Sequence, residues 1–352
     1  MTEQNIRIGH VSVGTGCPPF VIAELSGNHN GSLDRAIALV DAAAAAGAHA
    51  VKLQTYTADT LTIDVNSADF VVSGKDSPWS GRSLHELYQQ AHTPWDWHEP
   101  IMRRARGQGM VVFSTPFDET AVDFLESLDV PAYKIASFEN VHLPLIRKVA
   151  AQGKPVIIST GMASIGEISD AVQAARQAGC KDLVLLKCTS TYPATPENSN
   201  IATIKCLREI FDCEVGLSDH TMGVGAAVAA VALGATVIEK HITLARSEGG
   251  VDASFSMEPA EFRALVEETR RAYEAIGKVK FGPTPSEQAS LVFRRSIYVV
   301  KDLRAGEKLS PDSIRIIRPG FGLAPKYYDR VLGAAVRQDT RRGTPVSWDM
   351  LL

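Results

Sequence analysis

The chain has 352 residues, of which 45% are hydrophobic and 22% are charged, and its formal net charge is −4. This composition is typical of a globular protein and excludes a disordered, collagen-like or coiled-coil chain. The charge balance lacks the basic excess of nucleic-acid-binding proteins, so we expect no nucleic acid as a partner.

Eight short apolar segments recur between Phe20 and His241, and most are separated by helical segments. They are nearly continuous in Val, Ile, Leu and Phe, which is typical of strands buried on both faces of a parallel sheet. The predicted strands are Phe20–Leu25, Ala50–Thr55, Met110–Ser114, Ala132–Ala136, Pro155–Ser159, Leu183–Cys188, Glu214–Ser218 and Thr236–His241. Predicted helices between them include Leu33–Ala46, Thr120–Leu128, Leu143–Ala151, Ile165–Ala178 and Val224–Leu233.

Eight strands that alternate with helices predict an α/β fold, namely a (β/α)8 TIM barrel. A doubly wound open sheet is the alternative. The barrel is favoured because the strands number eight and no GxGxxG motif follows the first of them. The long interval between the second and third strands predicts a large loop, residues 58–92, over one face of the barrel.

A last barrel helix is predicted at Pro259–Gly277, and beyond it the pattern changes. A stretch rich in Gly and Pro indicates a linker, and Arg295–Val300 and Ser313–Ile317 are predicted as short strands of a small β-rich domain. The predicted organisation is a catalytic barrel of residues 1–280, a linker of residues 281–293 and a C-terminal domain of residues 294–352.

The sequence also bears on cellular location. No apolar run approaches the roughly 20 residues that a membrane helix needs, and the N-terminus lacks the basic and apolar regions of a signal peptide. The five cysteines are scattered and form no CxxC pair, which favours reduced thiols over a disulfide framework. We therefore expect a cytoplasmic protein without membrane association.

Polar side chains close every predicted strand, at the end of a barrel where catalysis takes place. A single residue of this kind could be a structural ion pair, because burying an unpaired charge is costly. Eight strand ends that converge on one face indicate an active site. The candidate residues are Glu24, Lys52, Thr115, Lys134, Ser137, Glu139, Ser159, Tyr192, Ser218, Asp219, His220, Glu239 and His241.

These candidates divide by chemistry into three groups. The lysines and hydroxyls suit a small dianion such as a phosphate ester, although either lysine could instead pair with a glutamate or form a Schiff base. His220 and His241 close consecutive strands and could hold a divalent metal, with Asp219 and Glu239 orienting the imidazoles.

Glu24 and Glu139 form the third group, as candidate acid–base groups. Two carboxylates in one cavity tend to have separated pKa values, and the alternative is that each only neutralises a lysine. Trp95 and Trp97 could form a sugar platform or a packing cluster at the start of a helix.

Several ordered motifs are similar to those of the sialic acid synthase family, which condenses phosphoenolpyruvate with an acylated amino sugar. The resemblance covers essentially the whole chain and extends to an antifreeze-like (SAF) domain at its C-terminus. The motifs are residues 22–31 (IAELSGNHNG), 52–55 (KLQT), 113–117 (FSTPF), 133–139 (YKIASFE), 159–162 (STGM), 216–221 (GLSDHT) and 238–241 (IEKH), with 295–302 (RSIYVVKD) and 318–323 (RPGFGL) in the SAF domain.

Within the family, four stretches most resemble the pseudaminic acid synthases, whose acceptor is 2,4-diacetamido-2,4,6-trideoxy-L-altrose. N-acetylneuraminate and legionaminic acid synthases are the alternatives. Outside the family, a Schiff-base lysine aldolase and a non-catalytic sugar-binding protein are the rival hypotheses. The stretches are residues 52–59 (KLQTYTAD), 86–95 (ELYQQAHTPW), 186–193 (LKCTSTYP) and 250–256 (GVDASFS).

The resemblance implies a role for each candidate. Glu24 and Glu139 would do the acid–base work, while His220 and His241 would hold Mn2+, or Mg2+ or Co2+ in its place. Arg318 would arrive from the partner subunit of a domain-swapped homodimer, whose C-terminal domain covers the partner's active site. Phosphoenolpyruvate would be bound by Lys52, Thr115, Lys134, Ser137, Ser159 and Ser218, and the sugar by Tyr192, Asp252 and Arg318.

Overall fold

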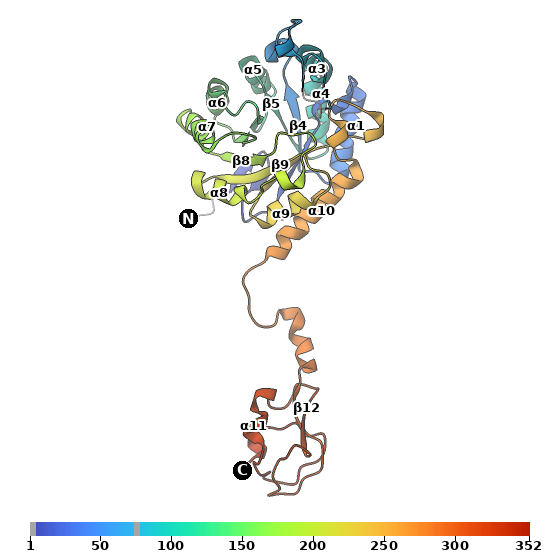
Figure 1. Ribbon diagram of the computed structural model, residues 1–352, viewed down its shortest axis with the longest axis vertical. Helices are drawn as coiled ribbons and strands as arrows, with labels where there is room; N and C mark the ends of the chain where they lie inside the picture. Colours follow the sequence, from blue (N-terminus) through green and yellow to red (C-terminus); the bar gives the residue numbers. More distant parts are fainter. Residues whose placement is uncertain (1–4, 74–77) are drawn as a thin grey trace. The chain divides into compact units, whose positions relative to one another are not determined.

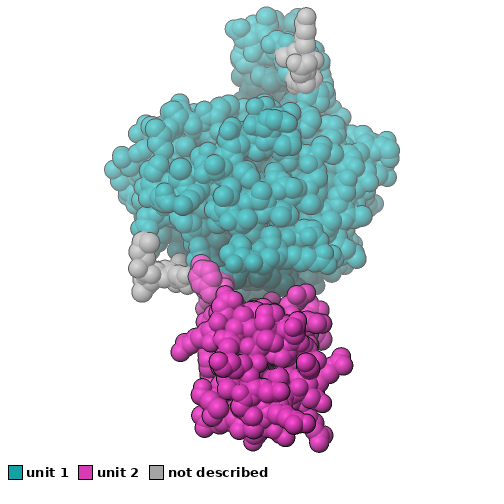
Figure 2. Space-filling model, turned by 60° about the horizontal axis from the view of Figure 1, so that its bottom comes forward, with its two compact units in different colours: residues 1–277 teal, residues 278–352 magenta. Residues whose placement is uncertain are grey.

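Eight parallel strands close into a barrel in the first of the two units of this computed structural model, which describes residues 5–73 and 78–352. One unit ends at Gly277 and the other begins at Lys278 (Figure 2). The order of strands around the barrel is β10-β3-β4-β5-β6-β7-β8-β9. The strands are β3 (Phe20–Glu24), β4 (Ala50–Thr55), β5 (Val111–Pro116), β6 (Tyr133–Ile135), β7 (Val156–Ser159), β8 (Leu183–Cys188), β9 (Glu214–Asp219) and β10 (Val237–His241).

All eight predicted barrel strands are confirmed, and pairing between the first and last of them decides the architecture. β10 lies beside β3 in parallel register, with Val237 opposite Phe20 and His241 opposite Glu24. An open doubly wound sheet would leave these two strands as edges, so this alternative is excluded.

Helices surround the barrel strands, as Figure 1 shows. They bury aliphatic faces against the outside of the barrel; Leu39, Val40 and Ala43 of the first helix, for example, have no solvent exposure. The helices are α1 (Leu33–Ala46), α4 (Trp95–Gly107), α5 (Glu119–Ser127), α6 (Leu143–Ala150), α7 (Ile165–Gln177), α8 (Thr203–Phe211), α9 (Gly225–Ala232) and α10 (Pro259–Ile276).

An N-terminal hairpin, β1 (Ile6–Ile8) and β2 (Val11–Val13), was not expected from the sequence. Its turn residue Gly9 lies against Val111, the first residue of β5. The hairpin therefore covers the amino-terminal end of the barrel, away from the polar strand ends. Each of its strands has three residues, too few to give a periodic signal.

The interval between β4 and β5 corrects one prediction. Instead of a plain loop, residues 58–92 contain α2 (Ala58–Leu61), a 3-10 turn and α3 (Leu84–Ala91). Residues 74–77 of this interval lie outside the described part of the chain.

The tryptophans that follow this interval have packing roles. Trp95 is the first residue of α4 and stacks on Phe124 with ring centroids 4.5 Å apart. Trp97 contacts His29 edge-on at 5.6 Å. These contacts support the packing interpretation of the pair rather than a sugar platform.

The second unit has a separate hydrophobic core around an antiparallel pair, β11 (Ser296–Val299) and β12 (Ile314–Ile317). Both strands were predicted. A 3-10 helix, η6 (Pro285–Phe293), occupies most of the expected linker, and a short α11 (Tyr328–Val331) follows the pair. None of the helices in the described residues is long and apolar enough to cross a bilayer, and all five cysteines are free thiols.

A buried ion pair joins β9 to β10 on the outer side of the barrel wall. Lys240 Nζ donates to Asp219 Oδ2 at 2.6 Å and also to the Thr221 carbonyl, and both charged side chains are at most 2% exposed. Because each charge is out of water, removing one leaves the other uncompensated.

We expect the substitution Lys240→Met to lower the free energy of unfolding of the barrel by about 3–5 kcal/mol. Lys205 forms an exposed i,i+4 pair with Glu209, so Lys205→Met should leave stability almost unchanged. Urea titration followed by circular dichroism measures both. Equal effects would show that the buried pair contributes no more than an exposed one.

Candidate active site

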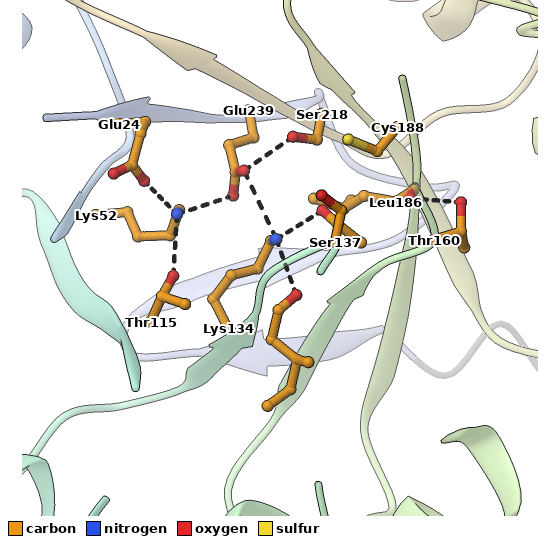
Figure 3. Close-up of polar contacts among 12 residues, drawn as sticks. Glu24, Lys52, Thr115, Lys134, Ser137, Thr160, Leu186, Cys188, Ser218 and Glu239 are labelled. Carbon is orange, nitrogen blue, oxygen red and sulfur yellow. Dashed lines mark hydrogen bonds and ion pairs between the residues drawn. The ribbon is translucent and has the colours of Figure 1, made fainter. Parts of the chain in front are cut away.

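Four charged side chains meet inside the barrel at the carboxyl ends of its strands (Figure 3). They are Glu24 on β3, Lys52 on β4, Lys134 on β6 and Glu239 on β10, and we call them the charge quartet. Glu24 and Lys52 are opposite each other in the strand register. All four are at most 5% exposed.

Lys52 contacts both carboxylates of the quartet. Its Nζ forms an ion pair with Glu24 Oε2 and lies 3.8 Å from Glu239 Oε2. It also donates to Thr115 Oγ1 at 3.1 Å. Burial lowers the pKa of Lys52, but Glu239 and Glu24 outweigh burial and raise the pKa above its usual value, so Lys52 is a cation at neutral pH.

Lys134 lies on the other side of Glu239. Its Nζ is 3.7 Å from Glu239 Oε1, and it donates to Ser159 Oγ at 2.6 Å and to the Ile135 carbonyl at 3.1 Å. Ser218 Oγ donates to Glu239 Oε1 at 3.0 Å. Burial raises the pKa of Glu239, but Lys134 and Lys52 have the larger effect and lower it. Burial lowers the pKa of Lys134 more than Glu239 raises it, and Glu239 is an anion between the two lysines.

Hydroxyl groups surround these lysines, as predicted. Thr115 and Ser159 bond to the two lysines, and Ser218 bonds to the carboxylate that they share. Ser137, in the loop after β6, accepts from Ser190 Oγ at 2.8 Å. All four predicted hydroxyl residues are buried, whereas Ser190 was not among the predicted residues.

The two candidate acid–base glutamates have different surroundings. Burial raises the pKa of both to about 7, in Glu24 against the opposing effect of Lys52 and in Glu139 against weaker opposition from its own N–H and Lys134. Among the described residues, Glu139 Oε2 is buried without a hydrogen-bond partner. The predicted separation of the pKa values is wrong, because burial dominates at both positions. Only Glu24 has an ion-pair partner that stabilises the anion.

The two predicted metal ligands lie next to each other. The ring centroids of His220 and His241 are 5.3 Å apart. His220 Nδ1 lies 2.9 Å from the Thr189 carbonyl, which can only accept, so this nitrogen carries the proton. His241 Nδ1 lies 3.2 Å from Ser26 Oγ. In a neutral imidazole whose Nδ1 donates, Nε2 is the unprotonated nitrogen that binds a metal.

A divalent ion fits this imidazole pair only in part. The described residues contain no group of three or more His, Cys, Asp or Glu side chains that could hold a metal. Two imidazoles can therefore supply two ligands, and oxygen atoms of substrate or water must complete the set.

The carboxylates predicted to orient the imidazoles have other partners. Asp219 accepts from Lys240 and from the Thr221 N–H at 2.8 Å, and Glu239 belongs to the charge quartet. The Thr189 carbonyl and the Ser26 hydroxyl orient the rings instead. Asp219 is the last residue of β9 and its carboxylate is occupied by Lys240 and the Thr221 N–H, so it does not orient the His220 ring.

Tyr192 links the two halves of the site. Its ring lies 4.5 Å from His220, and its hydroxyl is hydrogen-bonded with Ser137 beside the lysines. Phe255 and Trp79, neither predicted, pack on the Tyr192 ring at 5.1 Å and 5.5 Å. Trp79 lies in a turn and Phe255 ends the short 3-10 helix η5 (Ala253–Phe255), so no strand or helix periodicity marks either of them.

The remaining two predicted sugar-binding residues lie in different units. Asp252 is almost fully buried beside Ser26 and Gly27, which hydrogen-bond to its carboxylate. Arg318 follows β12 in the second unit.

A closed barrel whose strand ends carry two buried lysines, three glutamates and paired imidazoles defines a TIM-barrel enzyme. The model of the NeuB family matches residues 39–281, and the model of the SAF domain matches residues 294–352. The chain belongs to the NeuB family.

Several relatives and solved structures resemble the whole chain. It is 44% identical to pseudaminic acid synthase of Campylobacter jejuni, over 92% of this chain and 94% of that protein. It is 40% identical to pseudaminic acid synthase of Helicobacter pylori, over 94% and 97% of the two chains. The crystal structure of N-acetylneuraminic acid synthetase from Leptospira borgpetersenii in complex with citrate superposes with a TM-score of 0.72 at 32% identity, over 82% and 95% of the two chains.

The quartet generates a prediction about anion binding. Glu239→Gln leaves two buried lysines with one carboxylate. We therefore expect its melting temperature to be lower than that of the wild type, and added inorganic phosphate to raise its melting temperature by more than it raises that of the wild type. Glu214 pairs with Arg208 outside the quartet, and Glu214→Gln is the control that should not respond more strongly to phosphate. Thermal unfolding with and without phosphate measures this. Equal phosphate responses in all three proteins would contradict an anion site at the lysines.

Proposed function

We propose that this protein is a pseudaminic acid synthase. It condenses phosphoenolpyruvate, 2,4-diacetamido-2,4,6-trideoxy-L-altrose and water to a nine-carbon 2-keto acid, pseudaminic acid, and phosphate. The observation that carries the proposal is the charge quartet with its hydroxyl groups, lying in one barrel mouth with paired imidazoles. Similarity to proteins named pseudaminic acid synthases supports the choice of sugar.

Phosphoenolpyruvate is the substrate that suits the lysine side of the site. Its phosphate and carboxylate both need charge-assisted hydrogen bonds, and the fixed cations Lys52 and Lys134 can supply them without reorganisation. The surrounding hydroxyls of Thr115, Ser137, Ser159 and Ser218 add neutral donors.

The carbon–carbon bond forms between C3 of phosphoenolpyruvate and the aldehyde carbon of the open-chain sugar. Glu139, whose pKa is raised to about 7 by burial, donates a proton to the aldehyde oxygen. Water adds to C2, and Glu24 accepts a proton from it because Lys52 stabilises the Glu24 anion. The tetrahedral carbon then expels phosphate by C–O cleavage.

His220 and His241 would hold a divalent ion, Mn2+ or alternatively Mg2+ or Co2+. When bound, such an ion polarises an aldehyde oxygen as a Lewis acid. The Tyr192 ring contacts His220 and its hydroxyl bonds with Ser137, so it separates the metal side from the phosphoenolpyruvate side while touching both.

An aromatic wall favours a deoxygenated sugar. The Tyr192 ring packs on His220 and the Phe255 ring packs on His241. The Trp79 ring packs in turn on Tyr192 and Phe255, with ring centroids 5.5 Å and 6.3 Å apart. Trp79 Nε1 donates to the Val251 carbonyl at 2.8 Å. The five C–C bonds from C1 to C6 of an extended sugar span about 6 Å at ~1.5 Å per bond. With C1 at the histidines, C6 reaches the Trp79 side of the wall, where a methyl group is preferred to a hydroxyl.

We also propose a homodimer in which Arg318 of each SAF domain reaches the sugar in the partner's barrel. Residues 278–352 contain 14 Lys and Arg against 7 Asp and Glu, while the rest of the chain contains 22 against 33. The SAF domain is therefore positively charged and the barrel is negatively charged, which favours docking of the SAF domain of one subunit on the barrel of the partner subunit. A light-scattering mass equal to one chain would contradict the dimer.

An exposed apolar rim on the loops after β6, β7 and β9 and on the first residue of α7 supports the same arrangement. Its side chains are between 49% and 62% exposed, and an apolar rim around a polar mouth is typical of an interaction surface. The rim consists of Phe138, Val141, Met162, Ile165 and Met222.

Phosphate release tests the proposed activity. The protein is incubated with Mn2+ and phosphoenolpyruvate and, separately, with the altrose sugar, the precursor of legionaminic acid and N-acetylmannosamine. We expect phosphate release with the altrose sugar and with neither of the other two sugars, and we expect EDTA to abolish it. Release with another sugar would assign the protein to the legionaminic or N-acetylneuraminate synthases. No release with any of them would overturn the proposal.

The raised pKa of Glu139 predicts how activity depends on pH. Glu139 interacts with Lys134, Tyr88 and Tyr192, and as a proton donor it is active below its pKa. Glu24, whose pKa is also raised to about 7, must be ionised to accept a proton, so we expect a bell-shaped dependence of kcat/KM on pH with its maximum near pH 7. Glu139→Gln should lower kcat by roughly 10²–10⁴-fold and remove the fall on the alkaline side.

The control for this prediction is Glu197→Gln, which changes an exposed glutamate in the loop after β8 and should keep the wild-type profile. An alkaline fall that persists unchanged in Glu139→Gln would contradict the role of Glu139 as the proton donor.

The aromatic wall predicts selectivity at C6. The altrose substrate and its 6-hydroxy analogue differ in one oxygen, and we expect the wild type to prefer the 6-deoxy sugar in kcat/KM by roughly 10–100-fold. Trp79→Gln should remove most of this preference, whereas Trp79→Phe, which keeps an apolar ring, should retain it. A preference unchanged in Trp79→Gln would show that the wall does not contact C6.

A further inference from the structure

Ser26 has a backbone conformation that its residue type does not favour. It follows β3 by two residues, is buried and has φ +43°. Four other non-glycine residues with positive φ are described, and all of them are Asn or Asp, which tolerate the left-handed region. These are Asn30, Asp129, Asn200 and Asp212.

Strained residues persist where the surroundings hold them, and they cluster at functional sites. A glycine would satisfy the same turn at no steric cost. The serine side chain therefore needs an explanation other than the turn.

Three functional side chains surround Ser26. Its backbone N–H donates to Glu24 Oε1 at 3.0 Å, and its Oγ lies 3.2 Å from His241 Nδ1. Its hydroxyl also hydrogen-bonds to the Asp252 carboxylate. Glu24, His241 and Asp252 come from β3, β10 and the loop after β10, so one residue joins three separate segments.

The hydroxyl has one proton, which determines the direction of these bonds. Burial raises the pKa of Asp252, while the hydrogen bonds that its carboxylate accepts from Ser26 and from the Gly27 N–H favour the ionised form. An ionised carboxylate only accepts, so the Ser26 proton goes to Asp252. Ser26 Oγ must then accept from His241 Nδ1, which leaves His241 Nε2 unprotonated. This is the tautomer in which the outer nitrogen is free to act as a ligand.

We propose that Ser26 is a positioning residue that fixes the His241 tautomer and ring orientation for metal binding and holds the Glu24 carboxylate beside Lys52. The inference rests on the proposed function, because it takes His241 as a metal ligand. Supporting hydrogen bonds of this kind typically change metal affinity by about 10–100-fold when they are removed.

Substitutions of Ser26 separate positioning from structural support. Both Ser26→Gly and Ser26→Ala lose the hydroxyl, but only the glycine relieves the positive φ. We expect both variants to bind Mn2+ at least about tenfold more weakly in isothermal titration calorimetry. The melting temperature of Ser26→Gly should equal or exceed that of the wild type, and that of Ser26→Ala should be lower than that of Ser26→Gly.

The matched control is Asn200→Gly, which relieves the same φ of 43° at an exposed residue outside the active site. It should leave Mn2+ affinity unchanged. Wild-type affinity in both Ser26 variants would overturn the proposal, because the hydroxyl would then be a structural group only.

A second measurement keeps the inference separate from the proposed function. Imidazole 15N chemical shifts of the metal-free protein report the His241 tautomer directly. We expect the Nδ1-protonated form in the wild type and a mixture of tautomers in Ser26→Ala. If the wild type fails to bind Mn2+ yet shows this change, the metal assignment fails and the positioning role stands. An unchanged tautomer in Ser26→Ala would overturn the role of Ser26.

Discussion

The burial of two lysines and two glutamates inside one barrel is the constraint on which the rest of the site depends. No charge of the quartet could stay ionised there alone, because desolvation without a partner is costly. Glu239 lies between Lys52 and Lys134, 3.8 Å and 3.7 Å from their Nζ atoms. Lys52 and Glu239 are far apart in the sequence, and they meet only because β10 pairs with β3 and closes the barrel.

The rest of the chemistry is arranged around this balance of charge. The lysines keep cationic character in a site from which water is excluded, where they stabilise an anion far better than surface lysines do. The imidazoles lie at the ends of β9 and β10, and Tyr192 touches both sides. Glu139 is outside the quartet and its Oε2 has no partner among the described side chains, so burial alone raises its pKa. The neighbours of each glutamate thus determine its role, so that the quartet glutamates balance the lysines while Glu139 can donate a proton.

The sequence predicts the barrel well because its strands are buried on both faces and show as apolar runs. Strand ends then locate Lys52, Lys134, Glu239 and the two histidines. Partners are harder to predict, since they depend on register and side-chain direction. Asp219 pairs with Lys240 rather than with the imidazole that follows it, and Glu239 serves the lysines instead. The left-handed backbone of Ser26 and the ring of Trp79 leave no periodic signal, so only the structure reveals them.

The central claim is that the quartet binds phosphoenolpyruvate and that phosphate leaves with its bridging oxygen. Phosphoenolpyruvate labelled with 18O at the C–O–P bridge tests this most directly, with the altrose sugar as acceptor and mass spectrometry of both products. C–O cleavage predicts that all of the label is found in the phosphate. Label retained at C2 of the keto acid would mean that the P–O bond breaks, and it would contradict the account.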